Sequence, residues 1–335
     1  MRYLTAGESH GRALVGILEG LPAGLSINLD DINKQLQRRQ QGYGRGGRML
    51  IEKDQAEILS GIRFGKTLGS PIALVIWNRD WENWKAKMDP WQEPLDYKPV
   101  TVPRPGHADL AGAIKYQQRD IRNVLERASA RETAMRVAVG ALARQLLEHF
   151  HITIASHVTQ IHDAKSCVDH LAYKQLNELN EKADSSPVRC LDSKAEKEMI
   201  ARIQQAMHDK NTVGGAFAVI ARGVPPGLGS HVHWDRKLDG RIAQALMSIQ
   251  AIKAVGVGLG FEVASIWGSE AHDPIYYELE RGFYRKTSGA GGIEGGMSTG
   301  TLILIRVAMK PLSTLSRPLD SVDIVTKEPL AAHIE

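Results

Sequence analysis

The feature that most constrains this 335-residue sequence is a long apolar helical pattern at residues 124–150. Alanine, valine and leucine recur there at helical spacing. The apolar face is nearly continuous and consists of Ala134, Val137, Ala138, Ala141 and Leu142. A helix that is apolar over so much of its surface must be buried. The pattern therefore predicts a helix that crosses the core of the fold.

Shorter patterns lie on both sides of this helix in the sequence. Strands are predicted at residues 2–5, 13–19, 57–60, 72–77, 152–158, 216–221, 255–264 and 301–308. Further helices are predicted at residues 30–40, with Asp30 or Asp31 as N-cap, at 194–207 within a polar segment 164–208, and at 235–252. These patterns alone indicate an α/β-type protein.

Two segments of the chain resemble each other. Residues 20–25 read Gly-Leu-Pro-Ala-Gly-Leu and residues 223–228 read Gly-Val-Pro-Pro-Gly-Leu. Each follows an apolar strand pattern and precedes an amphipathic helix. Duplication of a strand–turn–helix unit and coincidence both account for this similarity. Duplication would favour one pseudo-symmetric domain over two independent domains.

Glycine and proline mark the turns and loops. The chain has 32 glycines, more than the average of about 7%, which predicts many tight turns or close approaches of backbone to a ligand. Residues 78–105 are rich in proline and tryptophan. Proline at that density predicts a long loop without regular structure, and the tryptophans favour a packed, functional loop.

Composition excludes several classes of protein. With 42 Lys and Arg against 38 Asp and Glu, the net charge is 42 − 38 = +4, too small for a charge-driven nucleic-acid tail. Hydrophobic residues at 43% exclude a mainly disordered chain. Cys167 and Cys190 are too few for a disulfide framework and are expected to be free thiols. Neither a membrane span nor a signal peptide is predicted, so we expect a cytoplasmic protein.

Two loops carry a histidine beside a glycine. His10 lies in Gly-Glu-Ser-His-Gly at residues 7–11, and His107 lies in Arg-Pro-Gly-His-Ala-Asp at residues 104–109. Histidine titrates near neutral pH and can act as an acid or a base. Taken singly, a structural role is the more common explanation for each, but two such loops favour a site.

Other loops are suited to anions. A glycine-rich turn at residues 42–47 is surrounded by Arg38, Arg39, Arg45 and Arg48. Their guanidinium groups and the backbone amides suit phosphate or carboxylate, and a solvated basic face is the alternative. The start of the long helix offers Arg122, Arg127, Ser129, Arg131 and Arg136. Residues 288–300 hold six glycines, which indicate either a backbone cradle for a ligand or a flexible loop.

Several motifs are excluded by their spacing. Residues 61–67 resemble a P-loop, but only three residues separate the glycines where the motif has four. Residues 256–260 lack the dinucleotide spacing and are interpreted as a strand. Histidine pairs at residues 149–151 and 231–233 have no acidic or cysteine partners nearby, so no metal site is expected.

Four motifs, taken in order, resemble the chorismate synthase family. They lie at residues 7–11, 104–109, 127–133 and 291–298, and the likeness runs from Met1 to about Glu328. The resemblance implies an α+β fold: a β-α-β sandwich, with a helical layer between antiparallel sheets, in a single pseudo-symmetric domain spanning residues 1–335. A homotetramer is implied as well.

The resemblance implies a lyase of the shikimate pathway, which supplies aromatic amino acid biosynthesis. Such an enzyme converts 5-enolpyruvylshikimate 3-phosphate to chorismate by anti-1,4-elimination of phosphate and a ring proton. It needs reduced FMN although the reaction has no net redox change. An external flavin reductase is the expected partner, and NADPH is expected to act only indirectly or weakly.

Roles of individual residues follow from the same resemblance. His10 would protonate the departing phosphate, and His107 would protonate the reduced flavin. Substrate groups would be held by Arg39, Arg45 and Arg48, of which the first two also match positions where the family contacts NADP. FMN would be contacted by Arg127, Ala128, Ser129, Gln250, Ala251, Gly295, Lys310, Pro311, Leu312, Ser313 and Thr314.

One departure from the family concerns the C-terminus. The family continues past the position of Glu335 with an Arg-Ser-Asp motif, whose arginine contacts flavin and whose aspartate assists proton removal. If the chain ends at Glu335, we expect flavin affinity to fall and turnover to fail or be severely reduced.

Two other functions have some support in the sequence. A non-catalytic anion or RNA binder would use the arginine loop and the tryptophan segment. The nearly balanced charge and the lack of an RNA-binding motif argue against it. A phosphotransferase has only the imperfect P-loop in its favour. Neither nucleic acid nor membrane is therefore expected as a partner.

Overall fold

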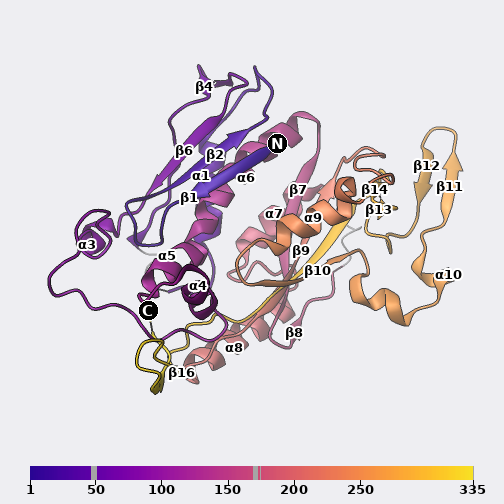
Figure 1. The fold of residues 1–335 in the computed structure, drawn as a ribbon. Coiled ribbons are helices and arrows are strands. Elements are labelled where there is room, and N and C mark those ends of the chain that lie inside the picture. The colour runs from indigo at the N-terminus through magenta and orange to yellow at the C-terminus, as the bar shows by residue number, and fades with distance from the viewer. Residues whose placement is uncertain (47–50, 169–172, 174, 335) are drawn as a thin grey trace. The chain divides into compact units, whose positions relative to one another are not determined.

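Two antiparallel sheets, each in its own part of the chain, organise the fold (Figure 1). The computed structural model describes residues 1–46, 51–168, 173 and 175–334. It divides into two units. Unit 1 comprises Met1–Leu146, Met207–Thr212 and Leu312–Glu335, and unit 2 comprises Leu147–Ala206 and Val213–Pro311. The fold is a mixed α+β fold, as predicted, with antiparallel sheets.

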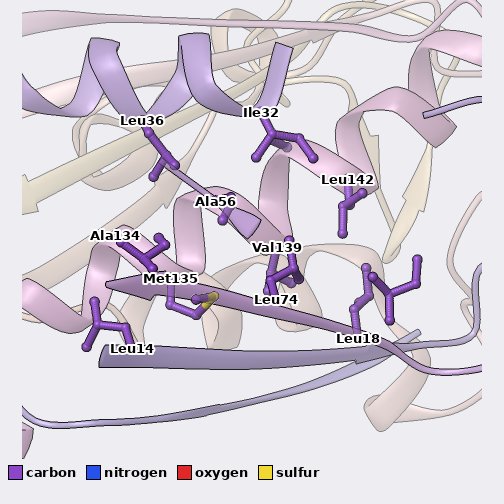
Figure 2. Close-up of a cluster of buried hydrophobic side chains, with 14 of the residues drawn as sticks. Leu14, Leu18, Ile32, Leu36, Ala56, Leu74, Ala134, Met135, Val139 and Leu142 are labelled. Carbon is purple, nitrogen blue, oxygen red and sulfur yellow. The ribbon is translucent and has the colours of Figure 1, made fainter. Parts of the chain in front are cut away.

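The sheet of unit 1 has the order β1-β2-β6-β3. Its strands are β1 (Arg2–Ala6), β2 (Ala13–Glu19), β6 (Ile72–Trp77) and β3 (Glu57–Ile58), all close to the predicted ranges. One face is covered by α1 (Leu29–Gln40) and α6 (Thr133–His149). Figure 2 shows Leu14 and Leu74 from the strands pointing toward Leu36 of α1 and Met135 of α6.

The predicted helix at residues 124–150 is broken. It consists of α5 (Arg122–Ala128), a 3₁₀ turn η1 (Ala130–Glu132) and α6. The break is at Ser129, whose backbone is extended (φ −60°, ψ 144°) and whose hydroxyl accepts a hydrogen bond from Arg131 N at 3.2 Å. The side chain thus caps the next turn, an alternative to helix that serine offers readily. The apolar α6 does lie in the core, as predicted.

The sheet of unit 2 has the order β10-β15-β9-β7-β8. Its strands are β10 (Ile252–Val257), β15 (Ile303–Met309), β9 (Gly215–Arg222), β7 (Thr153–Ile161) and β8 (Ala164–Lys165). Side chains alternate between its faces. Ala218 and Ile220 pack toward α7 (Leu176–Ser185), whereas Phe217 and Val219 pack toward α9 (Leu238–Met247). Helices therefore cover both faces of this sheet. The buried apolar side chains of α8 (Ser193–His208) belong to a separate hydrophobic cluster.

Several predicted boundaries are wrong for local reasons. Asn28, rather than Asp30 or Asp31, caps α1, because its side chain accepts from Asp30 N at 2.9 Å. The strand predicted at residues 255–264 ends at Val257, because Gly258 and Gly260 adopt φ of +58° and +59°. A 3₁₀ helix, η4 (Gly260–Ser265), follows. The helix predicted at 235–252 is shorter, since η3 (Trp234–Arg236) precedes α9 and Ile252 begins β10.

Some short elements were not predicted at all. The proline-rich loop contains one helical turn, α3 (Trp81–Trp84), and α4 (Asp109–Tyr116) and α10 (Gly268–Ala271) are further additions. The unpredicted hairpins are β4 (Ile62–Arg63) with β5 (Lys66–Thr67), β11 (Ile275–Glu278) with β12 (Gly282–Arg285), β13 (Ile293–Glu294) with β14 (Met297–Ser298), and β16 (Asp320–Val322) with β17 (Pro329–Ala331). Among the described residues, no helix is both long and apolar enough to cross a membrane.

The similar segments at residues 20–25 and 223–228 are held by matching hydrogen bonds. Thr67 serves the first segment and Ser298 serves the second. Each donates its hydroxyl to a proline carbonyl of its segment at 2.6 Å, and each accepts from the backbone N–H of the segment's last leucine at 2.9 Å. These identical contacts favour duplication over coincidence.

The hairpins that supply these hydroxyls correspond too. Residues 61–67 form β4–β5 and residues 292–298 form β13–β14, so the imperfect P-loop is the counterpart of the second glycine-rich loop. Both hairpins turn through two residues of positive φ. By this correspondence Phe64, with φ of +52°, occupies the place of Gly295, with φ of +59°.

We expect Leu142→Ala to lower the free energy of unfolding by about 2–5 kcal/mol, because Leu142 is completely buried and truncation leaves a cavity. Urea unfolding followed by circular dichroism measures the change. Leu95→Ala is the control, because the Leu95 side chain is fully exposed, and its effect should stay within about 0.5 kcal/mol. Equal losses in the two variants would contradict the core shown in Figure 2.

Candidate active site

The loop that carries His10 is fastened to the end of α5. Ser9 N donates to the Glu126 carbonyl at 3.0 Å, and His10 N donates to the Glu126 carboxylate at 2.8 Å. The loop begins at Gly7 with φ of +103°, where a Cβ atom would lie 2.3 Å from the Ala13 carbonyl oxygen. Glycine is therefore required for the turn that delivers His10 to this position.

The imidazole of His10 is held on its edge and on its face. Its Nδ1 lies 2.9 Å from the Glu126 carboxylate, which also accepts from Arg122 Nη1 at 2.8 Å. The ring stacks on Trp84 with 3.9 Å between centroids and 23° between planes. Arg122 lies 4.9 Å from the centroid of the same indole. The tryptophan-rich loop thus packs against a candidate catalytic histidine, in line with the prediction of a packed loop.

The predicted flavin residues 127–129 lie beside this loop. The Ser129 hydroxyl donates to the Ser9 hydroxyl at 3.2 Å. Arg127 donates through its Nη atoms to the carbonyls of Thr5 at 2.7 Å and Gly7 at 3.2 Å. These bonds place the guanidinium of Arg127 on the strand that leads to His10, so it also holds the loop in place.

Of the predicted arginine loop, Arg39 reaches the same region. Its Nε donates to the Thr133 hydroxyl at 3.0 Å, and its Nη2 donates to the Ala130 carbonyl at 3.1 Å. Its Nη1 also lies 3.5 Å from the Asp54 carboxylate. Arg45 is exposed, and its side chain folds back over its own loop. A Cβ atom built on Gly42 would lie 3.1 Å from Arg45 Nε. Arg48 lies outside the described residues.

A buried network lies around Arg131. Its Nη1 donates to the Asp54 carboxylate at 2.7 Å, and its Nε donates to Asn78 Oδ1 at 3.0 Å. Its Nη2 lies 3.6 Å from the Glu52 carboxylate. Asn78 in turn donates to the carbonyl of Gly11 at 2.7 Å. Arg131 was predicted as part of an anion supply, but its buried carboxylate partners indicate a structural role.

His107 is held by a second carboxylate. Its Nδ1 is hydrogen-bonded to Asp109, which also accepts from Arg104 Nε at 2.9 Å. Arg104 Nη1 donates to the Thr314 hydroxyl at 3.1 Å, and the Ser313 hydroxyl donates to the Gly106 carbonyl at 3.0 Å. The structure therefore brings the predicted flavin residues Ser313 and Thr314 to the His107 loop.

The carboxyl group of Asp109 is strongly perturbed. Burial by itself raises the pKa of Asp109, but the hydrogen bonds from His107 and Arg104 and the charge of Arg104 outweigh it. The pKa is held well below its ordinary value of 3.8. Asp109 is thus a charged acceptor for both neighbours.

The other predicted flavin residues belong to unit 2. Ala251 adopts φ of +69°, and its carbonyl accepts from Lys310 N at 3.0 Å, so residues 250–251 and 310–311 are neighbours. Burial, and then the positive charge of Lys253, lower the pKa of Lys310. Gly295 lies at the β13–β14 turn, and a Cβ atom there would project into open space.

Sequence reasoning missed the partners of the two histidines. Glu126, Trp84 and Asp109 were not predicted as site residues, although Asp109 lies within a predicted motif. Glu126 follows Arg122 by four residues, the spacing of ion pairs on a helix. That spacing was the available signal, but nothing in the sequence joined it to His10. In the part of the chain that the structure describes, no group of three metal-ligating side chains converges.

Known proteins with similar sequences and structures share one description. The chorismate synthase family profile matches residues 1–335. A chorismate synthase of Moorella thermoacetica is 58% identical over 337 residues, covering 100% of this chain and 86% of that protein. One of Aquifex aeolicus is 55% identical over 343 residues, with the same coverage of 100% and 86%. A crystal structure of chorismate synthase superimposes with a TM-score of 0.78 at 48% identity, covering 92% of this chain and 84% of that one.

The depressed pKa of Asp109 predicts a pH-dependent stability. A carboxylate of this kind stabilises the folded protein above its ordinary pKa, and the contribution is lost as the pH falls below it. Asp109→Asn should therefore be less stable than the wild type at neutral pH, and the difference should narrow below about pH 4. Urea unfolding over this pH range measures it, with Asp96→Asn, at an exposed position, as control. A stability difference that persists unchanged to about pH 3 would show that the charge of Asp109 is not its source.

Proposed function

The chain belongs to the chorismate synthase family and converts 5-enolpyruvylshikimate 3-phosphate to chorismate, and from this premise we propose how its own residues serve the reaction. It is a lyase of the shikimate pathway. The elimination breaks the C–O bond to phosphate and removes a ring proton, so the substrate loses phosphate without net redox change. The observation that carries the proposal is His10, which is fixed on a buried carboxylate beside two serine hydroxyls.

His10 donates a proton to the departing phosphate. A phosphate that leaves near neutral pH is stabilised by protonation and by hydrogen-bond donors placed where its charge develops. Ser9, Ser129 and Arg39 gather beside the end of α5 and supply hydroxyl and guanidinium groups suited to that anion. Arg45 and Arg48 complete the substrate set expected from the family.

His107 would hold a proton for the reduced flavin. Asp109 and Arg104 hold its Nδ1 edge, and the same arginine reaches Thr314 in the predicted flavin segment. This shared arginine supports a common position for the histidine and the cofactor. Because Nδ1 is bound to Asp109, the proton for the flavin would come from Nε2 of the doubly protonated ring.

The chorismate synthase family uses reduced FMN, and residues of this chain fit such a group. Lys310 and Lys253 present two positive charges close enough to depress a pKa, a donor set suited to an anionic cofactor. Gly295 leaves open space at its turn, so backbone can approach a planar ligand closely. Reduced FMN, when bound, supplies electron density transiently while phosphate leaves. In unit 2, Lys310 and the residues at 250–251 would hold it.

Other expectations extend this proposal. An indirect or weak role for NADPH and an external flavin reductase as partner rest on the family resemblance. On the basis of family membership we also propose a homotetramer, a cytoplasmic location and a single pseudo-symmetric β-α-β sandwich. The P-loop alternative is wrong, because residues 61–67 form a hairpin, and the family match replaces the RNA-binding alternative.

His10→Ala should lower kcat by about 10²–10⁴-fold, the usual contribution of a general acid. The measurement is an anaerobic assay of the full-length protein with 5-enolpyruvylshikimate 3-phosphate and photoreduced FMN. Oxidised FMN should give no product. His208→Ala, at an exposed histidine on α8, is the control and should keep wild-type activity. A His10→Ala variant with wild-type kcat would refute the proposed role.

Lys310→Ala should weaken binding of FMN more than binding of riboflavin, because it removes a positive charge that favours the phosphate of FMN. Quenching of flavin fluorescence measures both affinities without any need for turnover. Lys194→Ala, at an exposed position on α8, should leave both affinities unchanged. Equal weakening of FMN and riboflavin by Lys310→Ala would show that Lys310 does not recognise the phosphate.

A further inference from the structure

We propose that Glu126, held by Arg122, is a positioning residue that fixes His10 in the orientation needed for proton transfer. The inference rests on the proposed role of His10 as the acid for the leaving phosphate. It goes beyond that role because it assigns the orientation of the His10 ring to an ion pair. This pair joins Arg122 and Glu126, which lie one helical turn apart on α5. Trp84, which stacks on the ring, is assigned the same positioning role.

The first observation is that one carboxylate binds both the backbone and the side chain of His10. Glu126 accepts from His10 N at 2.8 Å and lies 2.9 Å from His10 Nδ1. Backbone and ring are thereby fixed to a single group. Rotation of the imidazole away from this position would break the side-chain bond and leave the buried carboxylate short of a donor, which is costly.

The second observation is the chemistry of the three donors. His10 N, His10 Nδ1 and Arg122 Nη1 all converge on Glu126, which is 2% exposed. A carboxylate can accept all three bonds, because its oxygens offer about four acceptor sites. A hydrogen bond to the carboxylate requires the proton of the ring to lie on Nδ1. The acid form of the ring carries a second proton on the remaining nitrogen, Nε2. This proton passes to the phosphate oxygen and leaves a neutral ring with its proton on Nδ1.

The third observation is that Trp84 and Arg122 pack beside the His10 ring. The indole covers one face of the imidazole at 3.9 Å, and Arg122 lies against the same indole at 4.9 Å. Arg122 therefore contacts both partners of His10. The stacking and the hydrogen bond of Nδ1 both oppose rotation of the imidazole, so its orientation is set before substrate binds.

The His107 loop repeats this arrangement with different residues. Asp109 accepts from His107 Nδ1 and from Arg104, as Glu126 accepts from His10 Nδ1 and from Arg122. Asp109 is 1% exposed. Two independent loops thus place a buried carboxylate with an arginine on the same nitrogen of a histidine. A purely structural ion pair would not need a histidine in both places.

The test compares Glu126→Gln and Glu126→Asp with a matched control. Glu132→Gln is that control, because Glu132 is also buried and pairs with an arginine four residues away, Arg136, at 2.9 Å. Glu126→Gln should lower kcat by roughly 10- to 100-fold, part of the contribution of the acid, with little change in KM. Glu126→Asp keeps the charge and should recover part of the loss. Glu132→Gln should keep kcat near the wild-type value.

A second readout does not depend on turnover. In protein labelled with ¹⁵N-histidine, the Nδ1–H proton of His10 should resonate at low field, assigned by its loss in His10→Ala. Glu126→Gln should move this resonance to higher field, and Glu132→Gln should leave it in place. Wild-type kcat and an unmoved resonance in Glu126→Gln would overturn the inference, while loss of activity in His10→Ala would still support the proposed function. Equal losses of kcat in Glu126→Gln and Glu132→Gln would also overturn it. An active His10→Ala would refute the proposed function and, with it, this inference.

Discussion

The buried guanidinium of Arg131 is the interaction on which the site of unit 1 depends. It binds Asp54, which follows the arginine loop, and Asn78, which holds the His10 loop through the Gly11 carbonyl. It lies in the 3₁₀ turn that interrupts the long helical pattern. Three segments far apart in the sequence are therefore fixed by one side chain. Because the network is buried, removing any member would leave an uncompensated charge or polar group.

Buried arginine–carboxylate pairs order the side chains of unit 1, but they contribute little to its free energy of unfolding. Moving an arginine and a carboxylate out of water is expensive, and their attraction repays that cost only when the geometry is good and other hydrogen bonds are satisfied. Among the described residues of unit 1, such pairs include Arg131 with Asp54, Arg122 with Glu126 and Arg104 with Asp109. Two of them hold a histidine. The apolar cluster of α1, α6 and the sheet provides the stability that these pairs do not.

The sequence predicted the elements whose residues repeat with a clear period, and missed those decided by tertiary contacts. The strands of both sheets and the buried α6 follow from apolar periodicity. The break at Ser129 did not, because residues 124–150 are all compatible with helix and only the contacts of Ser9 and Arg131 favour the extended serine. Likewise His10 and His107 were predicted from their motifs. Their carboxylate partners were missed, because 116 residues separate His10 from Glu126.

The two matching turns share one local geometry. The hydrogen bonds of Thr67 and Ser298 are the same, so both hairpins are fixed to their glycine-proline segments in the same way. Their tips differ. Phe64 is 88% exposed and stacks with Arg63, whereas Gly295 leaves its surroundings open. A bulky, strained residue at positive φ excludes close approach of a planar ligand, and glycine permits it. The hydrogen-bonded frame is thus common to both hairpins, and they differ in the residue at the tip.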